Sequence, residues 1–201
     1  MKILNASTGV LNLPACATRI FVVALTLLPL SVRTVDGFDQ PGSDYDNFTA
    51  SSAPVCRNSC AGDSRCQAWT WVKPGFQGPA ARCWLKHRLP KLVKNSCCNS
   101  GSRENISKRD VKAEDHTDRP GLDYKNFDTD SWNTCESACA NEQRCAAWAY
   151  GRPGYQGPRG HCWLKTRVPH PVENQKTISG VKFKPASVAI DPGTNLIPAR
   201  E

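Results

Sequence analysis

The sequence repeats itself at a fixed interval. PGFQGPAARCWLK at residues 74–86 returns as PGYQGPRGHCWLK at residues 153–165, a shift of 79 residues. The two copies align without a gap from residues 39–95 onto residues 118–174. Such internal similarity indicates two copies of one structural unit. We therefore expect two small domains of the same fold, in keeping with a hydrophobic content of only 39%.

The repeat also sets the expected domain boundaries. We place the two units at residues 37–101 and 116–183. Residues 102–115 between them are polar and charged, which predicts a flexible linker. Residues 184–201 contain three prolines and no periodicity, and we expect a disordered tail there.

The N-terminus resembles a targeting segment. An apolar run of 13 residues, 20–32, follows Lys2 and Arg19. This run is short for a membrane span but suits the core of a signal peptide. We therefore assign residues 1–36 to a signal peptide cleaved between Ser31 and Gly37, which predicts a secreted or periplasmic protein. The alternative is an uncleaved segment that anchors the chain to the membrane.

Eleven cysteines are many for a chain of 201 residues. Cytosolic proteins rarely form disulfides, so this number favours a disulfide framework in an oxidising compartment. Each copy carries the spacing C-x3-C-x5-C followed by a fourth cysteine. A zinc site made of these four thiols is the alternative, but the paired C-x2-C spacing usual in such sites is missing.

The spacing alone allows three pairings per unit, and local geometry narrows them. Short helices are predicted at residues 52–61 and 131–140, each beginning with a serine cap, and each carries two cysteines four positions apart on one face. The second cysteine of each helix lies six residues before the next cysteine in the sequence, which suits a local disulfide. The first cysteine of each helix is then left to pair with the fourth cysteine, in the CWLK strand. The predicted bonds are Cys60–Cys66, Cys56–Cys83, Cys139–Cys145 and Cys135–Cys162.

Cys97 and Cys98 have no counterparts, because Lys176 and Thr177 stand at those positions in the second copy. They can pair with each other or with another chain. Our hypothesis is that at least one of them forms an intermolecular bond.

The quoted stretch predicts a hairpin. Residues 66–72 and 145–151 read as strands, the Gly/Pro-rich loop follows, and CWLK begins a second strand. Trp69 and Trp71 are expected in the core beneath the helix. We interpret the glycines and prolines of this loop as residues that shape the turn and close the hairpin. The alternative is that the loop is functional and that Phe76 and Tyr155 at its tip contact a partner.

Side chains alternate across a strand, so Cys83 and Leu85 should face the helix while the residues between and after them face away. The second copy repeats this arrangement. An aromatic ring beside cations suits stacking on a sugar or anchoring an acidic protein loop; the alternative is that the tryptophan covers the sheet and the cations keep the surface soluble. The resulting candidates for ligand binding are Trp84, Lys86, Arg88, Trp163, Lys165 and Arg167.

The pattern C-x3-C-x5-C-x2-W-x-[WY] with CWLK resembles the PAN/apple domain, and DxPGxDYxNF with PGxQGP resembles its bacterial form. The resemblance implies an α+β fold in which each module is a curved antiparallel sheet crossed by one short helix stapled by disulfides. It implies the same cysteine pairing. It also implies a binding unit for proteins or carbohydrates that carries out no chemistry of its own.

Charge and motifs exclude other functions. The formal charge of +8 at pH 7 favours anionic partners, but the basic residues form no long block, so nucleic acid is not expected. Of four histidines only His161 falls within a repeated motif, and arginine replaces it in the first copy, so no duplicated catalytic site fits. We expect no enzyme, cofactor or metal. A disulfide-linked structural or oligomerising surface protein, joined through Cys97 or Cys98, is the alternative to a binding protein.

Overall fold

The structure is a computed structural model that describes residues 34–186. Most of the predicted signal peptide, and the predicted tail from residue 187 onward, lie outside the described residues. The described part belongs to one compact unit of the chain. Its first strand begins at Val35, two residues before the expected start of the first domain.

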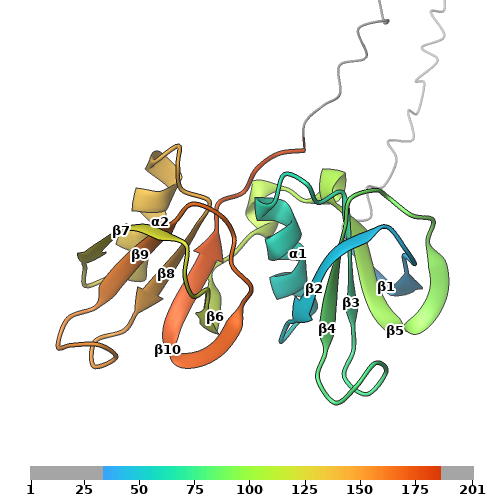
Figure 1. Ribbon diagram of the computed structural model, residues 1–201, viewed down its shortest axis with the longest axis horizontal. Helices are drawn as coiled ribbons and strands as arrows, with labels where there is room; N and C mark the ends of the chain where they lie inside the picture. The colour runs from blue at the N-terminus through green and yellow to red at the C-terminus, as the bar shows by residue number, and fades with distance from the viewer. Residues whose placement is uncertain (1–33, 187–201) are drawn as a thin grey trace, which may run out of the picture. The chain divides into compact units, whose positions relative to one another are not determined.

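Two modules of the same design follow each other along the chain (Figure 1). The first module consists of β1 (Val35–Asp39), β2 (Asp44–Thr49), α1 (Ala53–Gly62), β3 (Ala68–Val72), β4 (Arg82–Lys86) and β5 (Val93–Ser102). The second consists of β6 (Glu114–Asp118), β7 (Asp123–Asp128), α2 (Trp132–Asn141), β8 (Ala147–Gly151), β9 (His161–Lys165) and β10 (Val172–Val181).

Each module is an antiparallel five-stranded sheet covered on one face by its helix. The strand orders are β1-β5-β3-β4-β2 and β6-β10-β8-β9-β7, so the two sheets have the same topology. Ser52 and Ser131 occupy the N-cap positions of α1 and α2, as their sequences predicted. The Ser131 hydroxyl accepts a bond from the Asn133 backbone amide at 3.2 Å, whereas the Ser52 side chain forms no capping bond. The predicted α+β fold class is confirmed.

Disulfides join each helix to its sheet and to the turn that follows it. Cys56–Cys83 and Cys135–Cys162 connect the helices to β4 and β9, while Cys60–Cys66 and Cys139–Cys145 close the turns after the helices. All four bonds are the ones predicted. Because these sulfurs are bonded to one another, they are unavailable as zinc ligands, and the alternative reading of a zinc site is wrong.

Helix and sheet enclose a small core in each module. In the first, Trp69 is fully buried and Phe48 nearly so, and Trp71 packs against them while its indole N–H donates to the Ala50 carbonyl at 2.9 Å. In the second, the buried Trp148 and Tyr150 take the places of Trp69 and Trp71. The prediction that Trp69 and Trp71 lie beneath the helix is confirmed.

The connection between the modules is folded, whereas its composition predicted a flexible linker. Arg103–Asn105 and Lys108–Asp110 form short 3-10 turns, and Ser107 and Asp110 cap each other. Ile106 is buried in the core of the first module, and Ala113 packs against the core of the second. The segment contains few apolar residues, but the contacts of Ile106 and Ala113 attach it to both modules.

A buried polar cluster also links the modules. The Arg119 guanidinium and the Glu114 carboxylate, both almost fully buried, form an ion pair with an Nε–Oε2 distance of 2.9 Å. Arg119 also donates to the Ser59 hydroxyl at 3.1 Å, and Asn58 donates to Glu114 at 3.0 Å. Asn58 and Ser59 lie on α1, so the helix of the first module forms hydrogen bonds to both members of the Arg119–Glu114 ion pair in the second.

We predict that Arg119→Met destabilises the protein by about 3 to 5 kcal/mol, because it leaves the Glu114 charge buried without a partner. Urea unfolding followed by tryptophan fluorescence measures the change. Arg159→Met is the control, since its pair with Asp130 is exposed and should cost less than about 1 kcal/mol. Equal effects of the two substitutions would contradict the assignment of Arg119 as a link between the modules.

Candidate functional site

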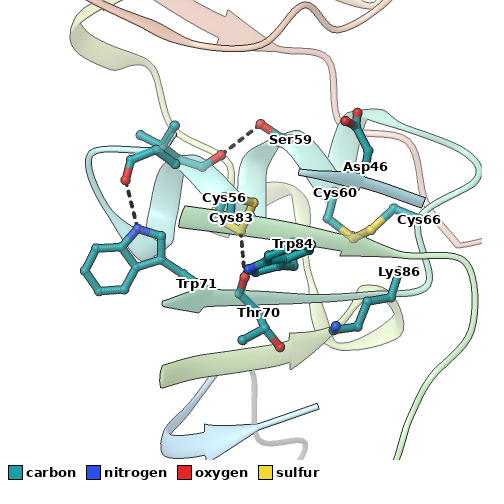
Figure 2. Close-up of a disulfide and its surroundings, with 12 residues drawn as sticks. Asp46, Cys56, Ser59, Cys60, Cys66, Thr70, Trp71, Cys83, Trp84 and Lys86 are labelled. Atoms are coloured by element: carbon teal, nitrogen blue, oxygen red, sulfur yellow. Dashed lines mark hydrogen bonds between the residues drawn. A yellow bond between two sulfur atoms is a disulfide. The ribbon is translucent and has the colours of Figure 1, made fainter. Parts of the chain in front are cut away.

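The face of each sheet that points away from the helix, called here the outer face, carries the candidate residues. Cys83 and Leu85 point to the helix side and are buried in the core, as predicted. Figure 2 shows the Cys56–Cys83 bond together with Trp84 and Lys86. Trp84 is only partly buried, and it packs with Val72 in a small cluster separate from the main core.

The two candidate lysines are not available to a ligand, so this part of the prediction is wrong. Lys86 and Lys165 are each 2% exposed, and their ammonium groups pair with Asp44 and Asp123. In the first module β1 and β2 are the opposite edges of the sheet, so the chain between them must cross it. Gly42 of this crossing segment accepts a bond from Lys86 at 3.3 Å, which closes the site over the ammonium group.

Trp84 covers the two cysteines that are unique to the first module. Cys97 and Cys98 are bonded to each other, are buried, and pack with Val72 against the tryptophan. The hypothesis that one of them joins another chain is therefore wrong, since neither sulfur is left free. The indole N–H of Trp84 donates to the Gln77 side chain at 2.9 Å.

The second module carries a cluster of three rings on its outer face. His161 and Trp163 lie with their centroids 4.6 Å apart, and Tyr155 and Trp163 both lie against Gly151. The Tyr155 hydroxyl accepts a bond from the Asn174 amide at 3.1 Å. The His161 ring is fixed by Asp128 at 2.7 Å through Nδ1 and by Asn126 at 3.2 Å through Nε2. We call Tyr155, His161 and Trp163 the ring cluster.

A glycine explains why only the second module has this cluster. A Cβ at Gly151 would lie 2.8 Å from Tyr155 and 3.1 Å from Trp163, so both rings need the space of the missing side chain. Val72 takes the same position in the first module and is buried beneath Trp84. Phe76, the counterpart of Tyr155, is 58% exposed, whereas Tyr155 is 36% exposed. The exchange of Val72 for Gly151 is visible in the sequence repeat. Only the structure shows that residue 151 lies against Tyr155 and Trp163.

Arg88 and Arg167 are exposed, as expected of surface cations. They lie two residues beyond the ends of β4 and β9, and the ring cluster is built without Arg167. Arg167 instead lines a cleft beside Asp63, Arg65 and His170.

A second repeated arrangement lies at the end of each helix. Tyr45 donates to Asp63 at 2.9 Å beneath the Arg65 guanidinium, and Tyr124 donates to Glu142 at 2.8 Å beneath Arg144. Burial, together with the neighbouring carboxylate, raises the pKa of Tyr124 to about 12 and the pKa of Tyr45 further. Because both copies keep these contacts, we interpret them as support for the fold.

Two further properties concern the class of protein. Residues 34–186 contain no group of three or more side chains suited to hold a metal ion. No helix in this part of the chain has the length and apolar character needed to cross a membrane.

The comparison with known protein families agrees with the repeat. The profile of the PAN domain matches the sequence twice, at residues 38–86 and 117–165. Among solved structures, the chain is similar to the two N-terminal apple domains of Toxoplasma gondii microneme protein 4, a solution structure ensemble. The match has 19% identity and a TM-score of 0.30, and it covers 78% of this chain and 92% of that one. A search of curated proteins found no match. With two matches to one domain, one in each module, this chain belongs to the PAN/apple family as a tandem pair of PAN domains.

Proposed function

We propose that this protein is a secreted or periplasmic binding protein that recognises carbohydrate through the ring cluster of its second module. Domains of the PAN/apple family are generally binding modules, are typically non-catalytic and occur in extracellular proteins. The observation that carries the proposal is the packing of Tyr155, His161 and Trp163 around Gly151 on the outer face.

The disulfides support a location outside the cytosol. Ten of the eleven cysteines form five disulfides in the structure. Such bonds form and persist in oxidising compartments and are rare where glutathione and thioredoxin keep thiols reduced.

The ring cluster has the features that a sugar requires. Partly exposed aromatic rings present flat apolar surface to the C–H face of a sugar, and neighbouring polar groups hydrogen-bond its hydroxyls. Asn126 and Asn174 lie at two sides of the cluster and hold His161 and Tyr155 in place. Fixed side chains lose little conformational entropy when a ligand binds, which favours affinity.

The outer face of the first module is less suited to this role. Trp84 packs on Val72 and on the Cys97–Cys98 bond, and its indole N–H already bonds to Gln77. The first module lacks the counterparts of the other two rings of the cluster, because Phe76 is 58% exposed and Arg82 stands at the position of His161. We therefore place the main sugar site in the second module.

Trp163→Ala should weaken binding about tenfold or more, because it removes the ring on which the sugar stacks. A glycan array with the full chain identifies a neutral ligand, and isothermal titration calorimetry then compares the variants. Trp84→Ala is the matched control from the first module and should change the dissociation constant by less than about twofold. The proposal is wrong if no sugar binds while a protein partner does, or if the two substitutions have equal effects.

Gly151→Ala should also weaken binding of the same sugar, by about threefold or more, because the added Cβ displaces Tyr155 or Trp163. Near-ultraviolet circular dichroism should show the altered packing of the rings. Gly157→Ala is the control, since a Cβ there meets no atom within 4 Å. Unchanged affinity and an unchanged spectrum for Gly151→Ala would show that the rings do not depend on this glycine.

A further inference from the structure

A cleft of about 580 Å³ lies between the end of α1 and the segment that follows β9. It lies away from the ring cluster, and its lining includes none of the three rings. Its volume falls within the range of sites that hold small ligands, about 300 to 1,000 Å³. Its charged and titratable lining residues are Asp63, Arg65, Arg167, His170 and Lys184.

The one carboxylate of the cleft is already neutralised. Arg65 donates to both oxygens of Asp63, at 3.2 and 2.8 Å, and Tyr45 donates to the same group at 2.9 Å. Burial alone would raise the pKa of Asp63, but the hydrogen bonds from Arg65 and Tyr45, together with the charge of Arg65, outweigh it and lower the pKa. Asp63 and Arg65 therefore form a closed ion pair; in the second module Glu142 pairs instead with Lys125 at 2.6 Å, while Arg144 lies over the Tyr124 ring.

His170 is held at the edge of the cleft by the first module. Its ring stacks on Phe48 with the centroids 4.6 Å apart, and Nε2 lies 3.0 Å from an Asp46 oxygen. Since Phe48 and Asp46 lie on β2, these contacts fix the segment after β9, and with it Arg167, against the first module.

Two cations remain without a partner. Among residues 34–186, the side chains of Arg167 and Lys184 form no ion pair. With Asp63 balanced by Arg65, Arg167 and Lys184 leave the cleft with a positive surplus, of which Asp46 beside His170 offsets one charge when His170 is neutral. Two cations at one partly enclosed site repel each other, and an anion between them removes that repulsion.

The backbone that carries Lys184 is firmly placed. Its amide donates to the Ala61 carbonyl at 3.1 Å, and its own carbonyl accepts a bond from the buried Arg103 guanidinium at 2.8 Å. Arg103 also donates to the carbonyls of Asp63 and Cys60. One buried arginine therefore holds two walls of the cleft together.

We propose that this cleft binds the sulfate or carboxylate group of an acidic saccharide through Arg167 and Lys184. Both cations can form charge-assisted hydrogen bonds to the anion, and the guanidinium can bind two of its oxygens at once. That the ligand is a saccharide depends on the function proposed for the ring cluster. That it carries an anionic group depends only on the charges of the cleft.

Binding of three probes to the full chain by calorimetry tests the proposal: a sulfated carrageenan tetrasaccharide, trigalacturonic acid and neutral chitotetraose. We expect one or both acidic probes to bind, and Arg167→Gln and Lys184→Gln each to weaken that binding about tenfold. Raising the salt concentration from about 0.05 to 0.3 M should weaken it further. Arg88→Gln is the matched control, because Arg88 holds the same position in the first module and does not line the cleft.

The acidic probe that binds identifies the anionic group, sulfate or carboxylate. The proposal is overturned if neither acidic probe binds, or if binding is the same in Arg167→Gln, Lys184→Gln and Arg88→Gln. Trp163→Ala separates this site from the ring cluster. Loss of the acidic probe in Trp163→Ala, with retention in Arg167→Gln, would assign the ligand to the ring cluster and overturn the cleft.

Discussion

The bond between helix and hairpin strand is the constraint on which each module depends. Cys56–Cys83 and Cys135–Cys162 each span 27 residues of sequence, and in the chain-entropy account such a loop contributes roughly 3 to 4 kcal/mol. This is comparable to the net stability of a small domain. Because the bond holds the helix on one face, only the outer face of each sheet, its edges and its loops remain available to a ligand.

The shared scaffold has allowed the two copies to differ where the fold permits it. Gly151 stands where the first module has Val72, which makes room for the ring cluster. Arg119 stands where the first module has Gln40, and its pair with Glu114 links the modules through α1. The duplication therefore produced one module with a more open aromatic surface and an interface that the other module completes.

The parts of the fold that depend on local spacing could be predicted from the sequence. Cysteines four apart on a helix, a serine cap and alternation along CWLK were sufficient for the helices, the hairpin and four disulfides. Long-range features were missed. β5 carries the polar run NSCCNSG without alternating apolar residues, so it did not read as a strand, although it lies between β1 and β3. The segment that crosses the sheet buries Lys86, and no local pattern shows that crossing.

Disulfide mapping of the purified protein under non-reducing conditions tests the central claim most directly. Proteolysis and mass spectrometry should recover Cys56 linked to Cys83, Cys135 linked to Cys162, and an internal bond between Cys97 and Cys98. A peptide joining Cys56 to Cys60 would show that the helix is not fixed to the sheet. A bond from Cys97 or Cys98 to a second chain would contradict the assignment of these residues to the surface beneath Trp84.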